Sequence, residues 1–486
     1  MTETRVRIAP SPSGNLHIGT ARTALFNYLY AKKMGGKFVL RIEDTDAERT
    51  EQQYIDNIFD SLKALGLNWD EGPDVGGDYA PYTQSERFDI YPEYAQKLLD
   101  AGFAYECYCT PEELEAEKQA SQANKVAHVY SGKCENLTEE EKAKLIAEGR
   151  KPAIRFSIKK ALKAFHETSE ITFDDLVKGE LKQNGDLIGD FVIMKSNGTP
   201  TYNFAVVVDD LLMKITDIIR GEDHISNTFK QILIYEALGV EVPRFGHLGM
   251  ILAPDRSKLS KRHGATAVSD FIKEGYLIEA LVNFVALLGW APSDGVEIKT
   301  VDEIAADFRI AEVSSSNSIF EYDKLNWMNG QYIKKMPLEE LLEHAKPFLA
   351  EYNLERYTHD ELLRILEITR EPITLLSELK YDTEYLFNDD IKLDEVSEVL
   401  SAEYANDVLS RTLEISEGLD FSSEEPLHEA FANLRGEFKE KGIKPKETMW
   451  VIRAATTGRT RGADMCAIIK LLGKDEFTRR IKAAMN

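Results

Sequence analysis

The chain has 486 residues, of which 43% are hydrophobic and 29% charged, so a packed core is expected and a wholly disordered chain is excluded. Its formal net charge of −24 argues against a general nucleic-acid coat protein, which would be basic overall. Four cysteines are too few for a disulfide framework, and no stretch approaches the ~20 apolar residues that span a bilayer, so we expect a soluble protein of a reducing compartment.

The N-terminal part alternates strand and helix patterns. Residues 5–9 alternate polar and apolar side chains and predict a strand, and residues 37–42 predict a second one. Between them, residues 16–34 have helical periodicity that ends at two glycines. A second helix is predicted over residues 54–65. Two strands joined by a helical crossover of ~20 residues form the right-handed parallel unit of α/β folds.

Residues 106–190 are expected to form an insertion in this α/β domain. They contain three of the four cysteines and two charged helical runs, at 111–121 and 138–149. After the insertion, residues 190–194 and 202–208 are predicted strands on either side of a turn. The sheet of the α/β domain is therefore expected to resume there.

The C-terminal third is predicted to be all-α. From residue 277 onward nearly every segment has helical periodicity, and the amphipathic ones lie near 337–350, 359–369, 394–413 and 463–472. Charge is uneven here, since residues 381–430 carry 15 acids and 2 bases whereas residues 441–486 carry 11 bases and 4 acids. The basic segment could hold a polyanion locally, or both segments could be ordinary solvated helix surface.

The loop over residues 10–20, PSPSGNLHIGT, has the composition of an anion-binding site. It leads from the first strand into the N-terminus of the first helix, where free backbone N–H groups and the helix dipole attract an anion. Gly14 and Gly19 would let a ligand approach the backbone, and His17 and Thr20 could donate hydrogen bonds to phosphate oxygens. Taken alone, a histidine before a helix is more often a capping or packing residue.

A second polar loop, residues 258–262 with the sequence KLSKR, carries three cations and a hydroxyl. Such a loop could close over a triphosphate and neutralise charge as it develops. Taken alone, it is more simply explained as a solvated basic loop.

Together the two loops resemble the paired signature of class I aminoacyl-tRNA synthetases. Further stretches resemble the bacterial-type glutamyl-tRNA synthetase family in particular: RIEDTD at 41–46, YTQSER at 82–87, VDD at 208–210 and IRGEDH at 219–224. The resemblance runs along essentially the whole chain, with its dense motifs in residues 5–262. Thr20, Leu259 and Arg262 depart from the most common forms of the two signatures, and these variants are ordinary within the family.

The resemblance implies a specific fold and reaction. The fold is an α/β Rossmann-like catalytic domain with an inserted α+β acceptor-binding domain, followed by all-α anticodon-binding domains. The expected segments are 1–105 with 191–240 (catalytic), 106–190 (acceptor end), 241–320 (stem contact, with the KLSKR loop), 321–380 and 381–486 (anticodon). The implied activity is the ATP-dependent attachment of L-glutamate to the 3′ end of tRNA(Glu) through a glutamyl-adenylate, by a cytoplasmic monomer.

The resemblance also implies the ATP site. Its residues are Pro10, Ser11, Gly14, His17, Gly19, Thr20, Lys258, Ser260 and Lys261. The catalytic residues among them are His17, Thr20, Lys258 and Lys261. The glutamate carboxylate that attacks ATP is already an anion, so these groups would position the phosphates and stabilise charge rather than act as a base. Mg²⁺ would accompany ATP mainly through phosphates and water.

The implied glutamate site consists of Arg7, Ala9, Ser11, Glu43, Tyr202 and Arg220. Arg7 and Arg220 are the candidates for binding carboxylates, and Glu43 is the candidate for the α-ammonium group. The alternative for both arginines is a structural ion pair. The family often has asparagine four residues after this tyrosine, where the chain has Val206, so one polar contact is expected to be missing.

Three cysteines in the insertion suit a tetrahedral Zn²⁺ site. The zinc form of the family resembles C-x-C…C-x-H, but the last position here is Asn136. Related enzymes can offer a tyrosine four residues before the third cysteine, where this chain has Tyr130, and His128 is a further candidate. The expected ligands are Cys107, Cys109, Tyr130 and Cys134, with free thiols as the alternative. The fourth cysteine, Cys466, lies among apolar helical residues and is expected in the core.

The helical C-terminal domains would read the anticodon. The candidates are Arg453, Arg459 and Arg461 with Trp450, and more weakly Arg370, and for each a surface or packing role is equally open. Three rival functions differ from this one in features that the sequence shows. A truncated paralogue that glutamylates a modified tRNA base lacks the helical third, and a glutaminyl enzyme carries β-barrel anticodon domains. A catalytically dead tRNA-binding homologue would have no reason to keep both signature loops.

Overall fold

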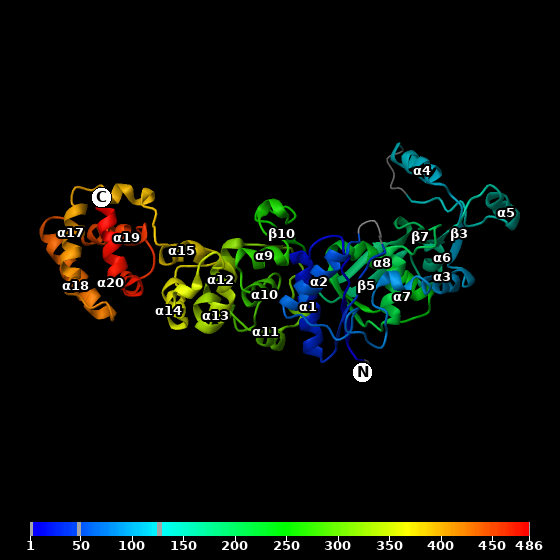
Figure 1. Ribbon diagram of the computed structural model, residues 1–486. Coiled ribbons are helices and arrows are strands. Elements are labelled where there is room, and N and C mark those ends of the chain that lie inside the picture. Colours follow the sequence, from blue (N-terminus) through cyan, green and yellow to red (C-terminus); the bar gives the residue numbers. More distant parts are fainter. Residues whose placement is uncertain (1–2, 46–49, 124–128, 486) are drawn as a thin grey trace. The chain divides into compact units, whose positions relative to one another are not determined.

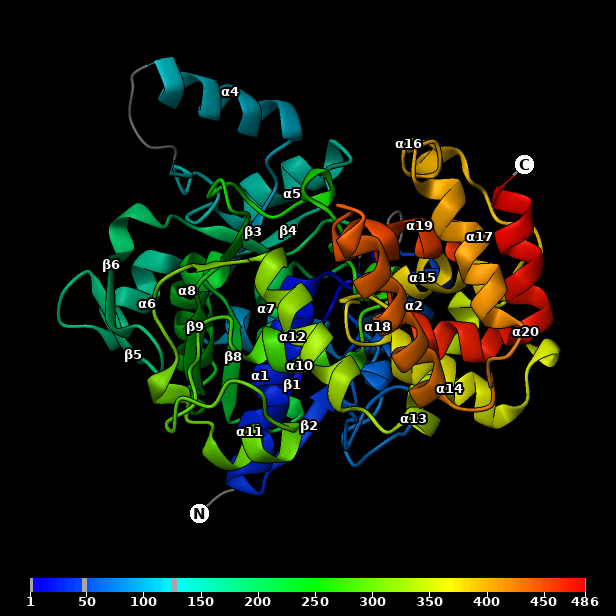
Figure 2. The same cartoon turned by 90° about the vertical axis from the view of Figure 1, so that its left-hand side faces the viewer.

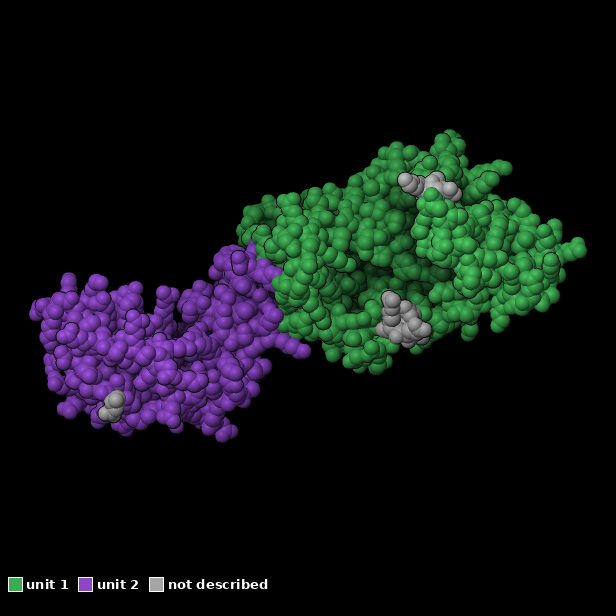
Figure 3. Space-filling model, turned by 90° about the horizontal axis from the view of Figure 1, so that it is seen from above, with its two compact units in different colours: residues 1–270, 282–321 green, residues 271–281, 322–486 purple. Residues whose placement is uncertain are grey.

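The computed structural model describes residues 3–45, 50–123 and 129–485, and the chain divides into two compact units. Unit 1 comprises residues 1–270 and 282–321, and unit 2 comprises residues 271–281 and 322–486 (Figure 3). Residues 271–281 thus belong to unit 2, residues 282–321 belong to unit 1 again, and all later residues belong to unit 2. No helix in the described ranges is both long and apolar enough to cross a membrane.

Unit 1 is built on parallel strands, as the sequence predicts for its N-terminus. Strand β1 (Arg5–Ile8) pairs in parallel with β2 (Lys37–Leu40), and α1 (Ile18–Met34) connects them. On its other side β1 lies beside β8 (Asp217–Gly221), because the Thr216 N–H donates to the Arg5 carbonyl at 2.9 Å, and β8 pairs in parallel with β9 (Arg244–Leu248). The strands therefore lie in the order β9, β8, β1, β2 (Figure 2).

Local signals explain the start and end of α1. His17 is its N-cap residue, with an extended backbone, and Gly35 ends it in the left-handed conformation at a φ of 63°. The strand before it differs from the predicted half-exposed pattern, because all four residues of β1 are buried, including Arg5 and Arg7. Arg5 is neutralised by a bidentate pair with Glu71 at 2.7 and 2.8 Å.

The strand predicted over residues 202–208 is wrong: this segment is the helix α7 (Tyr202–Leu212). Residues Phe204 to Asp210 are all buried, so the run shows no polar face that would reveal helical periodicity. Its three consecutive valines favour a strand by intrinsic preference, which tertiary context overrides here. The predicted strand before it is present as β7 (Phe191–Met194).

The predicted insertion divides between two sheets. Strands β3 (Ala104–Cys107) and β4 (Ala153–Phe156) form an antiparallel sheet with β7 in the order β3-β4-β7. The hairpin of β5 (Glu170–Asp175) and β6 (Gly179–Asn184) instead joins the parallel sheet, where Asp175 is paired with Phe245 of β9. The two predicted charged helices are present as α4 (Pro111–Ala123) and α5 (Glu139–Ala147).

The remaining elements of unit 1 surround this sheet. Its other helices are α2 (Gln52–Ala64), α3 (Tyr91–Asp100), α6 (Ile158–Phe165), α8 (Ile225–Ala237) and α11 (Val301–Asp307). A short parallel pair joins β10 (Ile251–Leu252) to β11 (Ser318–Ile319). Helices α9 (Val268–Glu274) and α10 (Ile278–Ala286) each cross from one unit to the other along the chain.

Unit 2 is all-α in its described residues, which confirms the prediction for the C-terminal third (Figure 1, yellow to red). Its helices are α12 (Tyr322–Lys335), α13 (Leu338–Ala345), α14 (His359–Thr369), α15 (Glu378–Phe387), α16 (Ser397–Leu400), α17 (Ala405–Ser416), α18 (Glu424–Glu440), α19 (Pro445–Thr457) and α20 (Met465–Ala484). They share one apolar core, in which Cys466 is buried as predicted. Gly473, with non-helical angles, kinks α20.

Candidate active site

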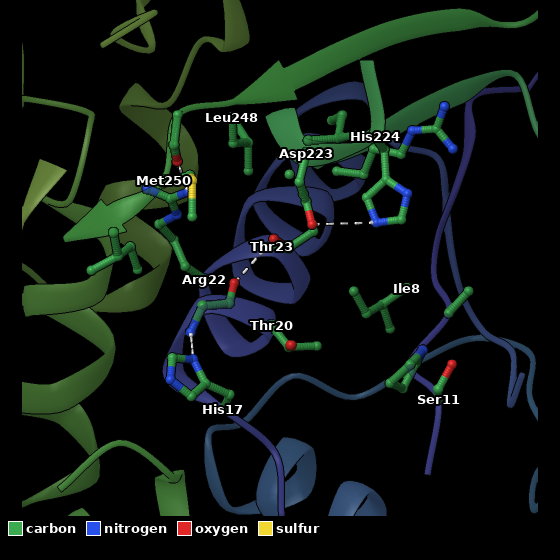
Figure 4. Close-up of a pocket in the computed structure, with 18 of the residues that line it drawn as sticks. Ile8, Ser11, His17, Thr20, Arg22, Thr23, Asp223, His224, Leu248 and Met250 are labelled. Atoms are coloured by element: carbon green, nitrogen blue, oxygen red, sulfur yellow. Dashed lines mark hydrogen bonds and ion pairs between the residues drawn. The ribbon is translucent and has the colours of Figure 1, made fainter. Parts of the chain in front are cut away.

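A cavity of about 490 Å³ lies in unit 1 at the carboxyl ends of β1, β8 and β9. Such ends are where open parallel sheets bind their ligands. Figure 3 shows that the surface of unit 1 is deeply hollowed, and Figure 4 shows this cavity in close-up. Of the predicted site residues, those that line it are Arg7, Ala9, Pro10, Ser11, His17, Gly19, Thr20, Glu43, Tyr202, Arg220 and Lys258. Gly14, Ser260 and Lys261 lie outside this lining.

The two signature loops, far apart in sequence, meet at this cavity through His17 and Lys258. The His17 Nδ1 accepts a hydrogen bond from the Gly19 N–H at 3.0 Å, so the proton of the neutral ring is on Nε2. Burial and the nearby Lys258 charge lower the pKa of His17, which keeps the ring neutral at pH 7. Its Nε2–H is thus available as a donor, and Figure 4 shows His17 directly before α1 and Thr20 in its first turn, across the cavity from Ser11.

Steric crowding explains why position 19 is a glycine. A Cβ there would lie 3.3 Å from the His17 Nδ1, so a larger residue would crowd the imidazole. Gly14, in contrast, has open space around it. Gly19 therefore leaves room for the imidazole ring of His17.

The cationic loop is held in place by its own hydrogen bonds. Ser260 caps the short 3₁₀ turn Lys261–His263, and its N–H donates to the His263 ring at 3.2 Å. Lys258 is exposed but reaches the cavity, whereas Lys261 is exposed outside it. The loop thus presents one of its two lysines to the cavity.

A buried ion network lies behind one wall of the cavity. Asp210 on α7 accepts hydrogen bonds from Arg7 at 3.2 and 3.1 Å and from Arg41 at 2.6 Å. Arg41 also donates to Glu43 at 3.0 Å. Burial raises the pKa of Glu43, against the lowering effect of Arg41, whereas the two arginines hold the pKa of Asp210 low in spite of burial. Arg7 therefore forms a structural ion pair with Asp210, which is the alternative role considered for it in the sequence.

Arg220 differs, because no carboxylate lies within ion-pair distance of it in the described part of the chain. Its side chain is buried at the end of β8 and is held by neutral groups only. One guanidinium nitrogen, Nη1, is buried without a hydrogen-bond partner among the residues that the structure describes. Burial lowers the pKa of Arg220, as expected for a desolvated cation without a counter-ion. A cation in this state is suited to a carboxylate ligand.

Several lining residues were not identified from the sequence as site residues. Asp223 and His224 follow β8, and the His224 Nδ1 lies 3.0 Å from the Tyr202 hydroxyl. Both lie in the IRGEDH stretch, directly after a strand, and polar residues at that place could have been predicted to line the site. Leu248 and Met250, at the end of β9, gave no such signal, and all four are labelled in Figure 4.

The three cysteines of the insertion meet, with Tyr130 among them. The Sγ atoms of Cys107, Cys109 and Cys134 all lie within 4.8 Å of one another. The Tyr130 hydroxyl lies 3.5 Å from the Cys107 Sγ and 3.1 Å from the Cys109 Sγ. The Arg155 guanidinium stacks over the Tyr130 ring at 3.9 Å, which supplies positive charge next to the thiols. His128, the other candidate ligand, lies outside the described residues.

The candidates for anticodon contact differ in their exposure and in their contacts within unit 2. Arg459 stacks over the Tyr381 ring at 3.6 Å and pairs with Asp382 at 3.4 Å, so its side chain is engaged within unit 2. Arg461 is exposed. The remaining candidates, Arg370, Arg453 and Trp450, are half-buried.

Family models match most of the chain. A model described as tRNA synthetases class I (E and Q), catalytic domain, matches residues 3–327. A second, described as an anticodon binding domain, matches residues 340–485.

Individual relatives are similar along their whole length. The glutamate–tRNA ligase of Carboxydothermus hydrogenoformans is 46% identical, over 99% of this chain and 100% of the relative. That of Natranaerobius thermophilus is also 46% identical, over 99% of this chain and 98% of the relative. Among solved structures, a glutamate tRNA ligase from Elizabethkingia meningosepticum in complex with its amino acid is similar with a TM-score of 0.88 at 34% identity, covering 99% of both chains.

Proposed function

Because the chain belongs to the class I tRNA synthetases of the glutamate and glutamine type, we propose that it attaches L-glutamate to the 3′ end of tRNA(Glu) at the expense of ATP. The reaction forms a glutamyl-adenylate and pyrophosphate, and transfer to tRNA then releases AMP. Curated relatives that match over the full length are glutamate–tRNA ligases, which supports this assignment.

The observation that carries the choice of amino acid is the charge of the buried site. Arg7 and Arg41 are neutralised by Asp210 and Glu43, whereas Arg220 has no carboxylate partner among the described residues. Asp209 also lies 3.9 Å from Arg41, but it is paired with Arg87 at 2.6 Å, so this group of arginines and carboxylates has one positive charge in excess. Glutamate has a net charge of −1 and would balance this charge, whereas neutral glutamine would leave it unpaired. The cavity therefore favours glutamate over the other amino acid of the family.

The glutamate site follows from the same geometry. Arg7 and Arg220 would bind the two carboxylates, and Glu43 would bind the α-ammonium group. Tyr202 and the backbone around Ala9 and Ser11 complete the site, and all six residues line one cavity. Val206, where the family often has asparagine, is buried and lies outside the cavity lining. No direct contact of that side chain with glutamate is therefore proposed.

The ATP site would occupy the end of the cavity near α1. His17 and Thr20 would donate to phosphate oxygens, and Gly19 would let the nucleotide approach the backbone. Pro10 and Ser11 supply the loop wall, and Gly14 and Ser260 would shape the loops from outside the present lining. Mg²⁺ would bind through the ATP phosphates and water.

Activation needs no general base, because the attacking α-carboxylate is already ionised. The bond that forms joins this carboxylate to the α-phosphorus, and the bond that breaks releases pyrophosphate. Lys258 would stabilise the developing negative charge from the cavity wall. Lys261 would do the same once its loop closes over ATP, since it lies outside the cavity here. In the second step the 2′-hydroxyl of the terminal adenosine attacks the glutamyl carbonyl.

For the insertion we propose a structural Zn²⁺ held by Cys107, Cys109, Tyr130 and Cys134. The donor set fits a tetrahedral zinc ion, because three sulfur atoms and a phenol oxygen converge at one point. Arg155 on the Tyr130 ring would offset the negative charge of the ligands. Metal analysis of protein purified without a histidine tag, compared with Cys107→Ser, tests this: one zinc per chain, lost in the variant, is expected.

The remaining partners follow from unit 2. Its all-α described residues match an anticodon binding domain, so we propose that it binds the anticodon of tRNA(Glu), with Arg453, Arg461 and Trp450 as candidate contacts. Its helical content argues against a glutaminyl-type β-barrel, and its presence argues against a truncated paralogue. We further propose a monomer in the cytoplasm.

One assay separates the proposal from its rivals. ATP–pyrophosphate exchange is measured with purified tRNA and either glutamate, glutamine or no amino acid. Exchange that depends on glutamate, ATP and tRNA is expected. Faster exchange with glutamine would contradict the proposed amino acid, and no exchange at all would indicate a catalytically dead homologue. Aminoacylation of purified tRNA(Glu) and tRNA(Gln) then identifies the tRNA substrate.

A further inference from the structure

The guanidinium of Arg220 is oriented by three neutral groups. Its Nε donates to the His247 Nε2 at 3.3 Å, and its Nη2 donates to the Thr228 hydroxyl at 2.6 Å and to the Gln231 amide oxygen at 2.8 Å. Thr228, Gln231 and His247 are fully buried. With these bonds made, Nη1 is the nitrogen that has no hydrogen-bond partner within residues 3–45, 50–123 and 129–485. The three neighbours therefore determine which edge of the guanidinium is free for a ligand.

The sheet brings His247 to this position. Arg220 on β8 and His247 on β9 are paired directly in the parallel ladder, so their side chains lie on the same face of the sheet. Thr228 and Gln231 come from α8. Asp175, the last residue of β5, reaches the same place from the strand on the other side of β9.

Asp175 determines the protonation of the His247 ring. The Asp175 Oδ2 lies 2.6 Å from the His247 Nδ1, and a carboxylate can only accept, so the ring proton is on Nδ1. The Nε2 is then unprotonated and can accept from the Arg220 Nε at 3.3 Å, which can only donate, and from the Thr228 hydroxyl at 2.9 Å. Burial lowers the pKa of His247, so the ring stays neutral and Nε2 keeps its lone pair.

Asp175 itself is fixed by the backbone. Its Oδ1 accepts from the N–H groups of Val177 and Lys178, both at 2.9 Å, and of His247 at 3.1 Å. Asp175 and His247 are both fully enclosed, with no exposed side-chain surface. Neither residue lines the cavity, so neither would touch substrate directly.

We propose that Asp175 and His247 are positioning residues for substrate selection: Asp175 holds His247 in the one tautomer that accepts from Arg220, and Arg220 is thereby aimed at a carboxylate of the bound amino acid. This inference rests on the proposed function, since it assigns to Arg220 a carboxylate of glutamate. It predicts that the chain Asp175, His247, Arg220 affects the affinity for the amino acid and not the affinity for ATP.

The variant Asp175→Asn tests this with little change of shape. Asparagine can keep the backbone hydrogen bonds at Oδ1, but its NH₂ group would donate to the His247 Nδ1. The ring proton would then move to Nε2, where it would face the donor Nε of Arg220 and would compete with the Arg220 Nη2 for the Thr228 hydroxyl oxygen. We expect the KM for glutamate in pyrophosphate exchange to rise about tenfold or more, with the KM for ATP within about twofold of wild type.

A matched control is available in the same unit. His166 and Glu236 form another histidine–carboxylate pair, at 3.0 Å, and neither is among the hydrogen-bond partners of Arg220 in the described part of the chain. Glu236→Gln makes the same chemical change as Asp175→Asn and is expected to leave the KM for glutamate unchanged. An equal rise in both variants would mean a general loss of structure and would overturn the proposed role.

The tautomer of His247 can be measured by NMR, independently of enzyme activity. The chain has nine histidines, so ¹⁵N-histidine-labelled protein compared with His247→Gln identifies the ring signals of His247. We expect Nδ1 protonated and Nε2 unprotonated in the wild type, and the reverse in Asp175→Asn. A wild-type ring protonated on Nε2, or a reversed tautomer with an unchanged KM for glutamate, would refute the proposal.

Two further results keep the test decisive. His247→Gln retains an acceptor for Arg220 without the link to Asp175, so its KM for glutamate should rise less than that of Asp175→Asn. If Asp175→Asn does not fold, His247→Leu, which removes the acceptor, takes its place and should raise the KM for glutamate more than His247→Gln does. In the double variant with Asp175→Asn and His247→Gln, position 247 has no imidazole ring whose tautomer could change. Its KM for glutamate should therefore be no higher than that of Asp175→Asn alone. A wild-type protein without glutamate-dependent exchange would instead refute the proposed function itself.

Discussion

At the residue scale, the site depends on which charges are paired. Arg7 and Arg220 both line the cavity and have the same chemistry in the sequence. The structure pairs Arg7 with Asp210 and gives Arg220 only neutral partners among the described residues. This difference depends on contacts between distant segments, so periodicity and motif spacing could not predict it.

The two arginines should respond oppositely in stability. Arg220→Leu removes a buried cation without a counter-ion, so the free energy of unfolding should stay the same or increase, while the KM for glutamate rises at least 100-fold. Arg7→Leu leaves Asp210 with one partner fewer and should lower the free energy of unfolding by about 3 kcal/mol. Urea denaturation and pyrophosphate exchange measure the two effects. Equal destabilisation by both substitutions would contradict the charge assignment.

Acid should destabilise the protein through His224. Burial and the Arg220 charge lower the pKa of His224 to about 4, below the ordinary value of 6.5. Between these pH values the unfolded chain takes up a proton at His224 that the folded protein does not, so stability falls as the pH falls through this window. His224→Gln should flatten the dependence between pH 6.5 and 4, measured by thermal unfolding. An unchanged slope in the variant would show that His224 does not contribute.

At the element scale, local signals were reliable at helix ends and unreliable in the core. Gly35 marks the end of α1, and Thr138 starts α5 with a capping box, because caps depend on a few neighbouring residues. In α7 the same reasoning failed, since a helix buried on all sides has no polar stripe. Likewise the β5–β6 hairpin joins β9 and not the β3-β4-β7 sheet of the insertion, which only tertiary packing decides.

The cysteine cluster gives an element-scale prediction. If Cys107, Cys109, Tyr130 and Cys134 hold zinc, the ion links the end of β3 to the loop before α5. Cys107→Ser, or a chelator, should then increase hydrogen exchange in β3 and β4, to which Tyr130 is joined through Arg155. Exchange in α1 and β8 should not change. Equal protection of β3 and β4 with and without metal would argue for free thiols.

At the scale of the whole molecule, unit 2 is discontinuous in sequence. Residues 271–281 belong to it although they precede the last segment of unit 1. The Leu277 N–H donates to the buried Asn329 side chain at 2.8 Å, and the Leu376 N–H donates to the Gly275 carbonyl at 3.0 Å. These bonds tie the short segment to helices far along the chain.

Gly275→Ala should loosen unit 2 selectively. Gly275 has a φ of 96°, and a Cβ there would lie 2.6 Å from the backbone nitrogen of Ser377, so alanine meets both strain and a clash. We expect faster hydrogen exchange in residues 322–486 and a loss of stability of about 1–3 kcal/mol, with unchanged exchange in the sheet of unit 1. Gly418→Ala is the control, because its Cβ would meet nothing within 4 Å. Unchanged protection of unit 2 would contradict the close packing at Gly275.

The sequence by itself determined the features that depend on neighbours along the chain. These are the N-terminal strand–helix–strand unit, the all-α C-terminal part, and the positions of the two signature loops in the chain. The tertiary structure decided which of these groups meet: His17 with Lys258, Arg7 with Asp210, and Arg220 with His247. The reason is physical, because caps and periodicity act over a few residues, whereas the energy of a buried charge or tautomer is determined by whatever distant group the sheet register places beside it.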